Sequence, residues 1–128
     1  MSTRDLLAVY RDYLQCLNDR RWDELGLFVV DDVSHNGARL GLDGYRAMLE
    51  ADAGGAPDLR YVPEILIADG QVVSCRLFFR CTPQRTFLGL EPTGRPVAFA
   101  EHVFYRFGDG RIAEVWSVVD TDAVRDQL

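Results

Sequence analysis

The chain has no excess of basic residues and no long apolar run. Its 128 residues include 14 lysines plus arginines against 20 aspartates plus glutamates, which gives a net charge of −6. This balance leaves no basic stripe to neutralise phosphates, so we expect neither nucleic acid nor an anionic membrane surface as a partner. The first residues lead directly into an amphipathic pattern, and no segment approaches membrane-spanning length. We therefore expect a cytoplasmic protein without a signal peptide.

Cysteine is also scarce, and the three residues present are odd in number: Cys16, Cys75 and Cys81. The last two would lie on one strand roughly 20 Å apart, at about 3.3 Å per residue, which is too far for a disulfide. We expect all three to be reduced, small apolar residues of the core.

Several motifs that carry chemistry are missing. The Gly-Leu-Asp-Gly sequence at 41–44 lacks the spacing and the lysine of a phosphate-binding loop, and no nucleophile elbow is present. His35, His102 and Asp120 could form a two-histidine, one-carboxylate metal set, but they show no short ligand spacing. We therefore predict no metal and no cofactor.

The first part of the chain has a helical pattern. Apolar residues recur at spacings of three and four, which predicts an amphipathic helix over residues 3–19 with Ser2 or Thr3 as its N-cap. The same spacing continues from Trp22 and predicts a second, shorter helix that ends near Asp31.

A brief strand or loop at 33–36 carries His35 and leads to a third helix. Asp43 is the expected cap of this helix, and the Gly-Gly-Ala-Pro sequence at 54–57 should end it.

The rest of the chain has the pattern of two β-hairpins followed by a helical tail at 121–128. Asp-Gly dipeptides join β-rich runs in pairs, residues 59–68 with 71–81 and residues 97–107 with 111–120. A Pro- and Gly-rich connection at 83–96 separates the hairpins and could cover a cavity. Helices followed by an antiparallel sheet predict a single α+β domain over residues 1–128, a cone-shaped barrel in which a strongly curved sheet wraps around the first helix.

Asp120 is the leading candidate for catalysis. It lies where an apolar strand ends, and burial beside Phe99 and Trp116 would raise its pKa toward the range of a general acid or base. The alternative is that Asp120 only caps the C-terminal helix.

Residues throughout the chain resemble the SnoaL-like polyketide cyclase (ester cyclase) branch of the nuclear-transport-factor-two-like superfamily. The resemblance rests on the segments 33–37 and 87–90 and on C-terminal residues, namely Phe99, Glu101, Arg106-Phe107, Asp109 to Ile112, Glu114, Trp116, Asp120 and Gln127-Leu128. It implies a cone-shaped fold and an intramolecular aldol closure with Asp120 as acid/base. It also implies that His35 and Asn36 belong to the pocket and that His102 supplies a histidine of the penultimate strand.

The pairing of the last two strands leaves the choice between Glu101 and His102 open. A two-residue turn at 109–110 pairs Phe99 with Asp120, so Glu101 shares the face of Asp120 and His102 points away. A β-bulge would reverse this arrangement. Register favours Glu101, and the resemblance favours His102.

The remaining candidates also have structural interpretations. His35 could only hydrogen-bond within its loop, and Asn36 suits a turn before a glycine. Phe79 and Trp116 suit the walls of a pocket for a planar ligand.

We therefore expect a cofactor-independent cyclase or isomerase that acts on a small hydrophobic or aromatic carbonyl compound, with a non-catalytic binding or accessory domain as the alternative. A homodimer is expected through the outer face of the sheet, where Leu77 or Val103 would lie depending on register.

Overall fold

The computed structural model describes residues 2–128, apart from the side chain of Arg4. Its elements follow the order α1 (Thr3–Asn18), η1 (Trp22–Leu27), β1 (Val29–His35), β2 (Ala38–Arg39), α2 (Gly41–Gly55), β3 (Val62–Asp69), β4 (Val72–Cys81), β5 (Val97–Gly108), β6 (Arg111–Val119) and α3 (Thr121–Gln127). The six strands form one curved, open sheet in the order β2-β1-β6-β5-β4-β3. The α+β fold predicted from the sequence is confirmed.

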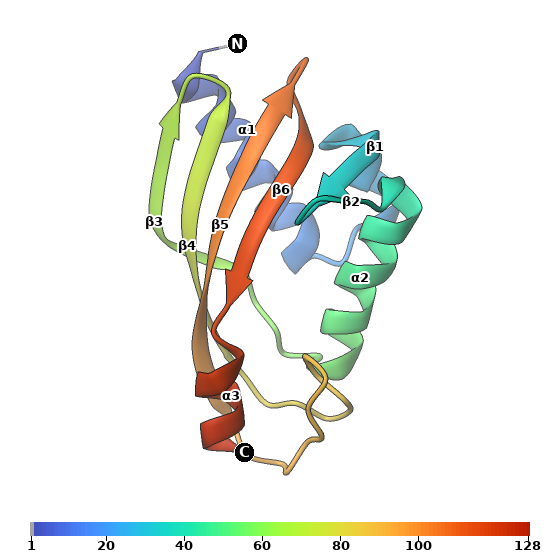
Figure 1. Cartoon of the computed structure of the whole chain (residues 1–128), viewed down its shortest axis with the longest axis vertical. Coiled ribbons are helices and arrows are strands. Elements are labelled where there is room, and N and C mark those ends of the chain that lie inside the picture. The colour runs from blue at the N-terminus through green and yellow to red at the C-terminus, as the bar shows by residue number, and fades with distance from the viewer. Residues whose placement is uncertain (1) are drawn as a thin grey trace.

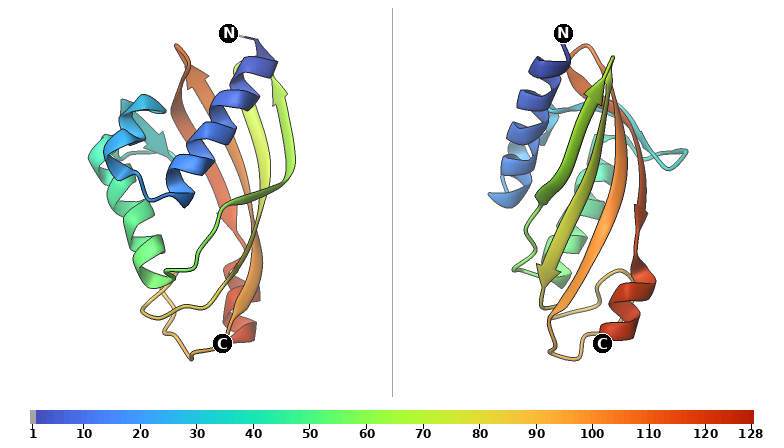
Figure 2. Two further views of the ribbon diagram at one scale, coloured as in Figure 1. Left: turned by 180° about the vertical axis from the view of Figure 1, so that it is seen from behind. Right: turned by 90° about the vertical axis from the view of Figure 1, so that its left-hand side faces the viewer.

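The helices α1 and α2 lie on the same, inner side of this sheet. Helix α1 runs across β3 to β5, while α2 lies beside β1, and α3 follows β6 at the lower end (Figures 1 and 2). Apolar residues of α1 at the predicted spacing are buried against the sheet, namely Leu6, Tyr10, Tyr13, Leu14 and Leu17. Ser2 is the N-cap, because its side chain accepts a hydrogen bond from the backbone N–H of Asp5.

Two helix predictions need correction. The segment after α1 is only a short 3-10 helix, and strand β1 already begins at Val29, where an α-helix was expected. Val29 and Val33 are buried within β1, which pairs in parallel with β6 and joins β2 in a hairpin. The N-cap of α2 is Leu40, while Asp43 lies in the first turn.

Both predicted Asp-Gly hairpins are present, and β3 with β4 and β5 with β6 pair as antiparallel neighbours. Asp109 and Gly110 both have positive φ, 52° and 81°, as a two-residue hairpin turn requires. Strand β3 begins at Val62, a few residues later than expected.

A β-bulge in β6 changes the predicted register of the last hairpin. Phe107 pairs with Ile112, but Arg106 already pairs with Glu114, so Ala113 is the additional residue. Beyond the bulge Glu101 lies opposite Val119, and the expected pairing of Phe99 with Asp120 is wrong. Because side chains alternate between faces, this one residue moves Asp120 to the outer face.

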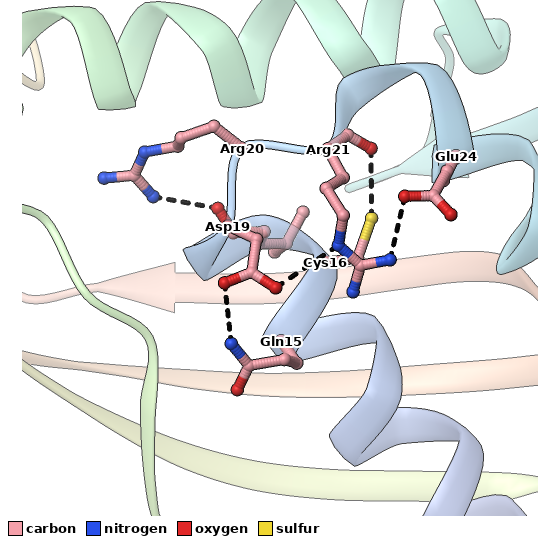
Figure 3. A network of polar contacts seen from close by, with 7 residues as sticks. Gln15, Cys16, Asp19, Arg20, Arg21 and Glu24 are labelled. Carbon is pink, nitrogen blue, oxygen red and sulfur yellow. Dashed lines mark hydrogen bonds and ion pairs between the residues drawn. The ribbon is translucent and has the colours of Figure 1, made fainter.

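Polar contacts at the end of α1 hold the segment that leads into β3. Arg20, with φ of 58°, donates to the carbonyl oxygens of Leu17, Pro57 and Leu59. Arg21 forms ion pairs with Asp19 and Glu24, and the thiol of Cys16 donates to the backbone oxygen of Arg21 (Figure 3). The segment at 57–59 is therefore fixed against the C-terminal end of α1.

The three cysteines are buried and free, as the sequence predicted: Cys16, Cys75 and Cys81. Among the described residues, no helix combines the length and the apolar character that a membrane crossing requires.

Candidate active site

A cavity of about 340 Å³ lies between the inner face of the sheet, α1, α2 and the loop at 83–96. Phe79, Phe87 and Phe99 form an apolar wall, with the rings of Phe79 and Phe99 stacked at 5.0 Å between centroids. Phe87 and Leu88 come from the loop at 83–96, so part of this loop covers the cavity as predicted. Polar groups enter the cavity from β1, α2, β5 and β6.

Glu101 projects from β5 into this cavity, on the same face as Phe99. Burial, together with the smaller effect of the nearby charge of Asp52, raises the pKa of its carboxyl group from 4.5 to about 7. A hydrogen bond from Ser117 opposes this effect by stabilising the ionised form. The carboxyl group therefore exchanges protons near neutral pH.

Asp52 is a second carboxyl group in the cavity, and the sequence analysis missed it. It comes from α2, and burial raises its pKa from 3.8 to about 6. The signal was present in the chain, because Asp52 follows the core residues Tyr45 and Leu49 at helical spacing. An acidic residue on the apolar face of a helix could have indicated a cavity.

His35 lies at the end of β1, and its Nε2 atom is 3.1 Å from the hydroxyl oxygen of Ser117. The Ser117 hydroxyl has one proton. When it donates that proton to Glu101, its oxygen can only accept from His35, so the His35 ring carries a proton on Nε2. Burial lowers the pKa of His35, which favours the neutral ring. Glu101, Ser117 and His35 thus form a chain of hydrogen bonds across β5, β6 and β1.

Two pairs of buried tyrosine hydroxyls lie at the site, and Tyr13, Tyr45 and Tyr105 line the cavity. The oxygens of Tyr13 and Tyr45 are 2.7 Å apart, and Tyr10 donates to Tyr105 at 3.3 Å. Burial raises the pKa of each of these four groups. They remain protonated at neutral pH and act as hydrogen-bond donors.

Three of the predicted site residues lie outside the cavity. Asp120 is exposed and accepts a hydrogen bond from the backbone N–H of Ala123 at 3.0 Å, so it caps α3. His102 is exposed on the outer face beside Arg76, and Trp116 is 41% exposed on the same face. Their expected position in the pocket is wrong: the bulge in β6 turns Trp116 and Asp120 outward, and His102 lies on the outer face of β5, away from Glu101.

The other predicted residues do line the cavity, namely His35, Asn36, Phe79, Phe99 and Glu101. Asn36 has a clear structural role, because its side-chain amide bonds both the N–H and the carbonyl oxygen of Ser117, at 2.8 and 3.1 Å. With φ of 48°, it also starts the turn between β1 and β2. Among the described residues, no group of three metal-ligating side chains is present.

Comparisons with known proteins agree with this architecture. The family model for SnoaL-like polyketide cyclases matches residues 7–128, so the chain belongs to this family. A solved SnoaL-like polyketide cyclase from Agrobacterium tumefaciens strain C58 is 49% identical with a TM-score of 0.91, and the match covers 99% of this chain and 98% of that chain.

More distant solved structures share the fold. IdmH from Streptomyces antibioticus, proposed to be a polyketide cyclase, is 21% identical with a TM-score of 0.84, covering 95% of this chain and 96% of that one. AclR from Streptomyces galilaeus, proposed to be a hydroxylase, is 22% identical with a TM-score of 0.81, covering 96% and 94%. A comparison with curated proteins found no match.

Proposed function

We propose that this chain catalyses a cofactor-independent acid/base reaction on a small, largely apolar carbonyl compound, of the intramolecular aldol type that closes a ring. One observation carries the proposal. Asp52 and Glu101 line the same cavity, and burial raises their pKa values to about 6 and about 7. Carboxyl groups with pKa values near neutrality can both accept and return a proton efficiently.

The two carboxyl groups have complementary roles. Burial alone raises the pKa of Asp52, whereas the charge of Asp52 adds to the effect of burial on Glu101. Between about pH 6 and pH 7, Asp52 is mostly ionised while Glu101 is mostly protonated. Asp52 is therefore the base of the pair and Glu101 the acid.

The reaction balances with these two groups alone. Asp52 takes a proton from the carbon beside a carbonyl group, and the electrons of the broken C–H bond form an enolate. The enolate carbon attacks a second carbonyl carbon of the same molecule, which forms the C–C bond. Glu101 gives its proton to the oxygen of that second carbonyl. Proton transfer from Asp52 to Glu101 then restores both groups.

The shape of the cavity supports a planar substrate. A volume of about 340 Å³ is at the small end of the range for ligand pockets, about 300–1,000 Å³. The stacked rings of Phe79 and Phe99 offer a flat apolar wall, while His35 and the tyrosines that line the cavity supply hydrogen-bond donors. A small hydrophobic or aromatic carbonyl compound fits this combination.

Deuterium exchange tests the acid/base activity without knowledge of the natural substrate. The bicyclic ketone 2-tetralone is incubated in D2O with the protein, and loss of its α-protons is followed by NMR. We expect exchange above the uncatalysed rate, with a maximum between about pH 6 and pH 7. Asp52→Asn and Glu101→Gln should each reduce the protein-dependent rate by about 100-fold or more.

The control is Asp120→Asn, because Asn also caps a helix and Asp120 lies outside the cavity. This variant should keep the exchange rate of the wild type. Full exchange in Asp52→Asn and Glu101→Gln, or its loss only in Asp120→Asn, contradicts the assignment.

The second candidate function is non-catalytic binding of the same class of compound. It is favoured by the exposed position of Asp120, the aspartate to which the family resemblance assigns the chemistry. Binding of 2-tetralone in the cavity with no exchange above background would support this alternative and contradict the catalytic proposal.

The outer face of the sheet supports the further proposal of a homodimer. Large apolar side chains are exposed there, among them Phe104 at 51%, Trp116 at 41% and Val118 at 74%. Leu77 and Val103, which the sequence suggested for this face, are instead buried on the inner side. An isologous dimer would cover the exposed patch with its own copy.

A further inference from the structure

The hydroxyl of Tyr61 has an unusual position in the cavity. Tyr61 lines the cavity and is only 7% exposed, yet among the described residues its hydrogen bonds are made by its backbone and none by its hydroxyl. The Tyr13, Tyr45 and Tyr105 hydroxyls each have a tyrosine partner. Within the described residues, no fully enclosed polar side-chain atom lacks a partner, so the Tyr61 hydroxyl has some accessible surface, and Tyr61 lines the cavity. It is a donor available to a ligand.

The backbone of Tyr61 is held firmly in place. The side-chain oxygen of Asn18 accepts from the Tyr61 N–H at 2.7 Å, and the Asn18 amide donates to the Tyr61 carbonyl oxygen at 3.0 Å. Two residues earlier, Arg20 holds the carbonyl oxygen of Leu59 from the same end of α1. The ring packs edge-on against Phe79, with 5.3 Å between centroids. Its direction is therefore fixed before any ligand binds.

Tyr61 shares its cavity with both carboxyl groups, Asp52 and Glu101. Burial raises its pKa well above 10, and the charges of Asp52 and then Glu101 raise it further. The group remains protonated over the whole range in which Asp52 and Glu101 titrate. An oxygen atom bound by Tyr61 would thus lie beside the base and the acid of the proposed reaction.

We propose that the Tyr61 hydroxyl donates a hydrogen bond to the substrate's carbonyl oxygen and stabilises the enolate oxygen that develops when the adjacent carbon loses its proton. This inference rests on the proposed function and adds a catalytic residue to it. Tyr61 contributes most when it binds the developing negative charge more strongly than the neutral carbonyl group. It also orients the substrate, with the reactive carbonyl toward Tyr61 and the planar ring along Phe79.

Infrared spectroscopy of bound 2-tetralone, with ¹²C and ¹³C labels at the carbonyl carbon, tests the contact directly. In the wild type, the carbonyl stretch should lie at lower frequency than in an apolar solvent, because a hydrogen bond weakens the C=O bond. Tyr61→Phe removes one oxygen atom and should return the band toward the apolar value. The melting temperature should not fall, because the removed hydroxyl has no hydrogen-bond partner in the described part of the chain.

Kinetics then separate a catalytic role from a structural one. The rate constant for α-proton exchange at saturating 2-tetralone should fall about 100-fold in Tyr61→Phe. The Kd for the ketone should rise by less than about tenfold, as expected for one hydrogen bond. Asp120→Asn is again the control, because Asp120 lies outside the cavity and Asn keeps the cap of α3. It should keep both the band and the exchange rate.

The outcomes distinguish this inference from the function on which it rests. An unchanged carbonyl band and an unchanged exchange rate in Tyr61→Phe would overturn the role of Tyr61 while the wild-type exchange still supports acid/base catalysis. Absence of exchange in the wild type would instead contradict the catalytic proposal. If the carbonyl band shift is then still lost in Tyr61→Phe, Tyr61 binds the ligand but does not take part in catalysis, and its catalytic role is refuted.

Discussion

The substitution Glu101→Gln should stabilise the protein at alkaline pH while it removes activity. Gln has nearly the same shape as a protonated Glu and can still accept a hydrogen bond from Ser117. The folded state holds the proton of Glu101 more tightly than the unfolded chain does, because burial raises its pKa from 4.5 to about 7. Stability from this group is fully present below about pH 4.5 and is lost as the pH rises through about 7.

The size of the effect follows from the pKa difference. At about 1.4 kcal/mol per pKa unit, ionisation of the buried carboxyl group costs about 3 kcal/mol of folding free energy at high pH. Part of this cost is already present at pH 5. The free energy of unfolding of Glu101→Gln, relative to that of the wild type, should therefore rise by about 2.5 kcal/mol from pH 5 to pH 8. Asp52 is present in both proteins, and its own contribution largely cancels.

Urea unfolding at pH 5 and pH 8 measures this difference directly. The control is Glu64→Gln, an exposed carboxylate on the same sheet that pairs with Arg76. Its effect should stay below about 1 kcal/mol at both pH values, as is typical of surface ion pairs. A difference between Glu101→Gln and the wild type that is the same at pH 5 and pH 8 would refute the burial of this carboxyl group in a poorly solvated cavity, and with it the basis of the proposed chemistry.

Two further predictions concern the loop over the cavity and the outer face of the sheet. Gly55→Ala would place a Cβ atom 2.6 Å from the carbonyl oxygen of Thr86, so we expect a loss of about 1–3 kcal/mol in stability and weaker binding of 2-tetralone. Gly54→Ala, where a Cβ atom meets nothing within 4 Å, should leave both the stability and the binding of 2-tetralone unchanged. Equal behaviour of the two variants would contradict a close contact between Gly55 and the loop at Thr86. Phe104→Glu should convert a wild-type dimer into a monomer in light scattering, whereas Leu27→Glu, at an even more exposed apolar residue of η1, should not. A monomeric wild type at micromolar concentration would rule out the proposed dimer.

The local pattern of the chain was sufficient to predict most elements of the fold. Helical spacing located α1, the glycine- and proline-rich sequence at 54–57 located the end of α2, and β-rich runs joined by two Asp-Gly pairs located the hairpins of β3 to β6. These features depend on neighbours within a few residues, which is the range that a sequence pattern describes. The prediction of a second α-helix was wrong because the apolar spacing from Trp22 to Val29 fits an α-helix as well as a 3-10 helix that leads into a strand.

The identity of the site residues depended on tertiary structure. Asp52 and Glu101 are far apart in the chain, and only the packing of α2 against the curved sheet places them around one cavity. The bulge at Ala113 turned Asp120 outward and left Glu101 as the acid of the last hairpin that faces the cavity. The sequence by itself determined an α+β chain with a curved sheet and a set of candidate acids. Only the tertiary structure determined which acidic side chains are buried away from solvent. Burial depends on residues from distant elements, and a shift of one residue exchanges the two faces of a strand.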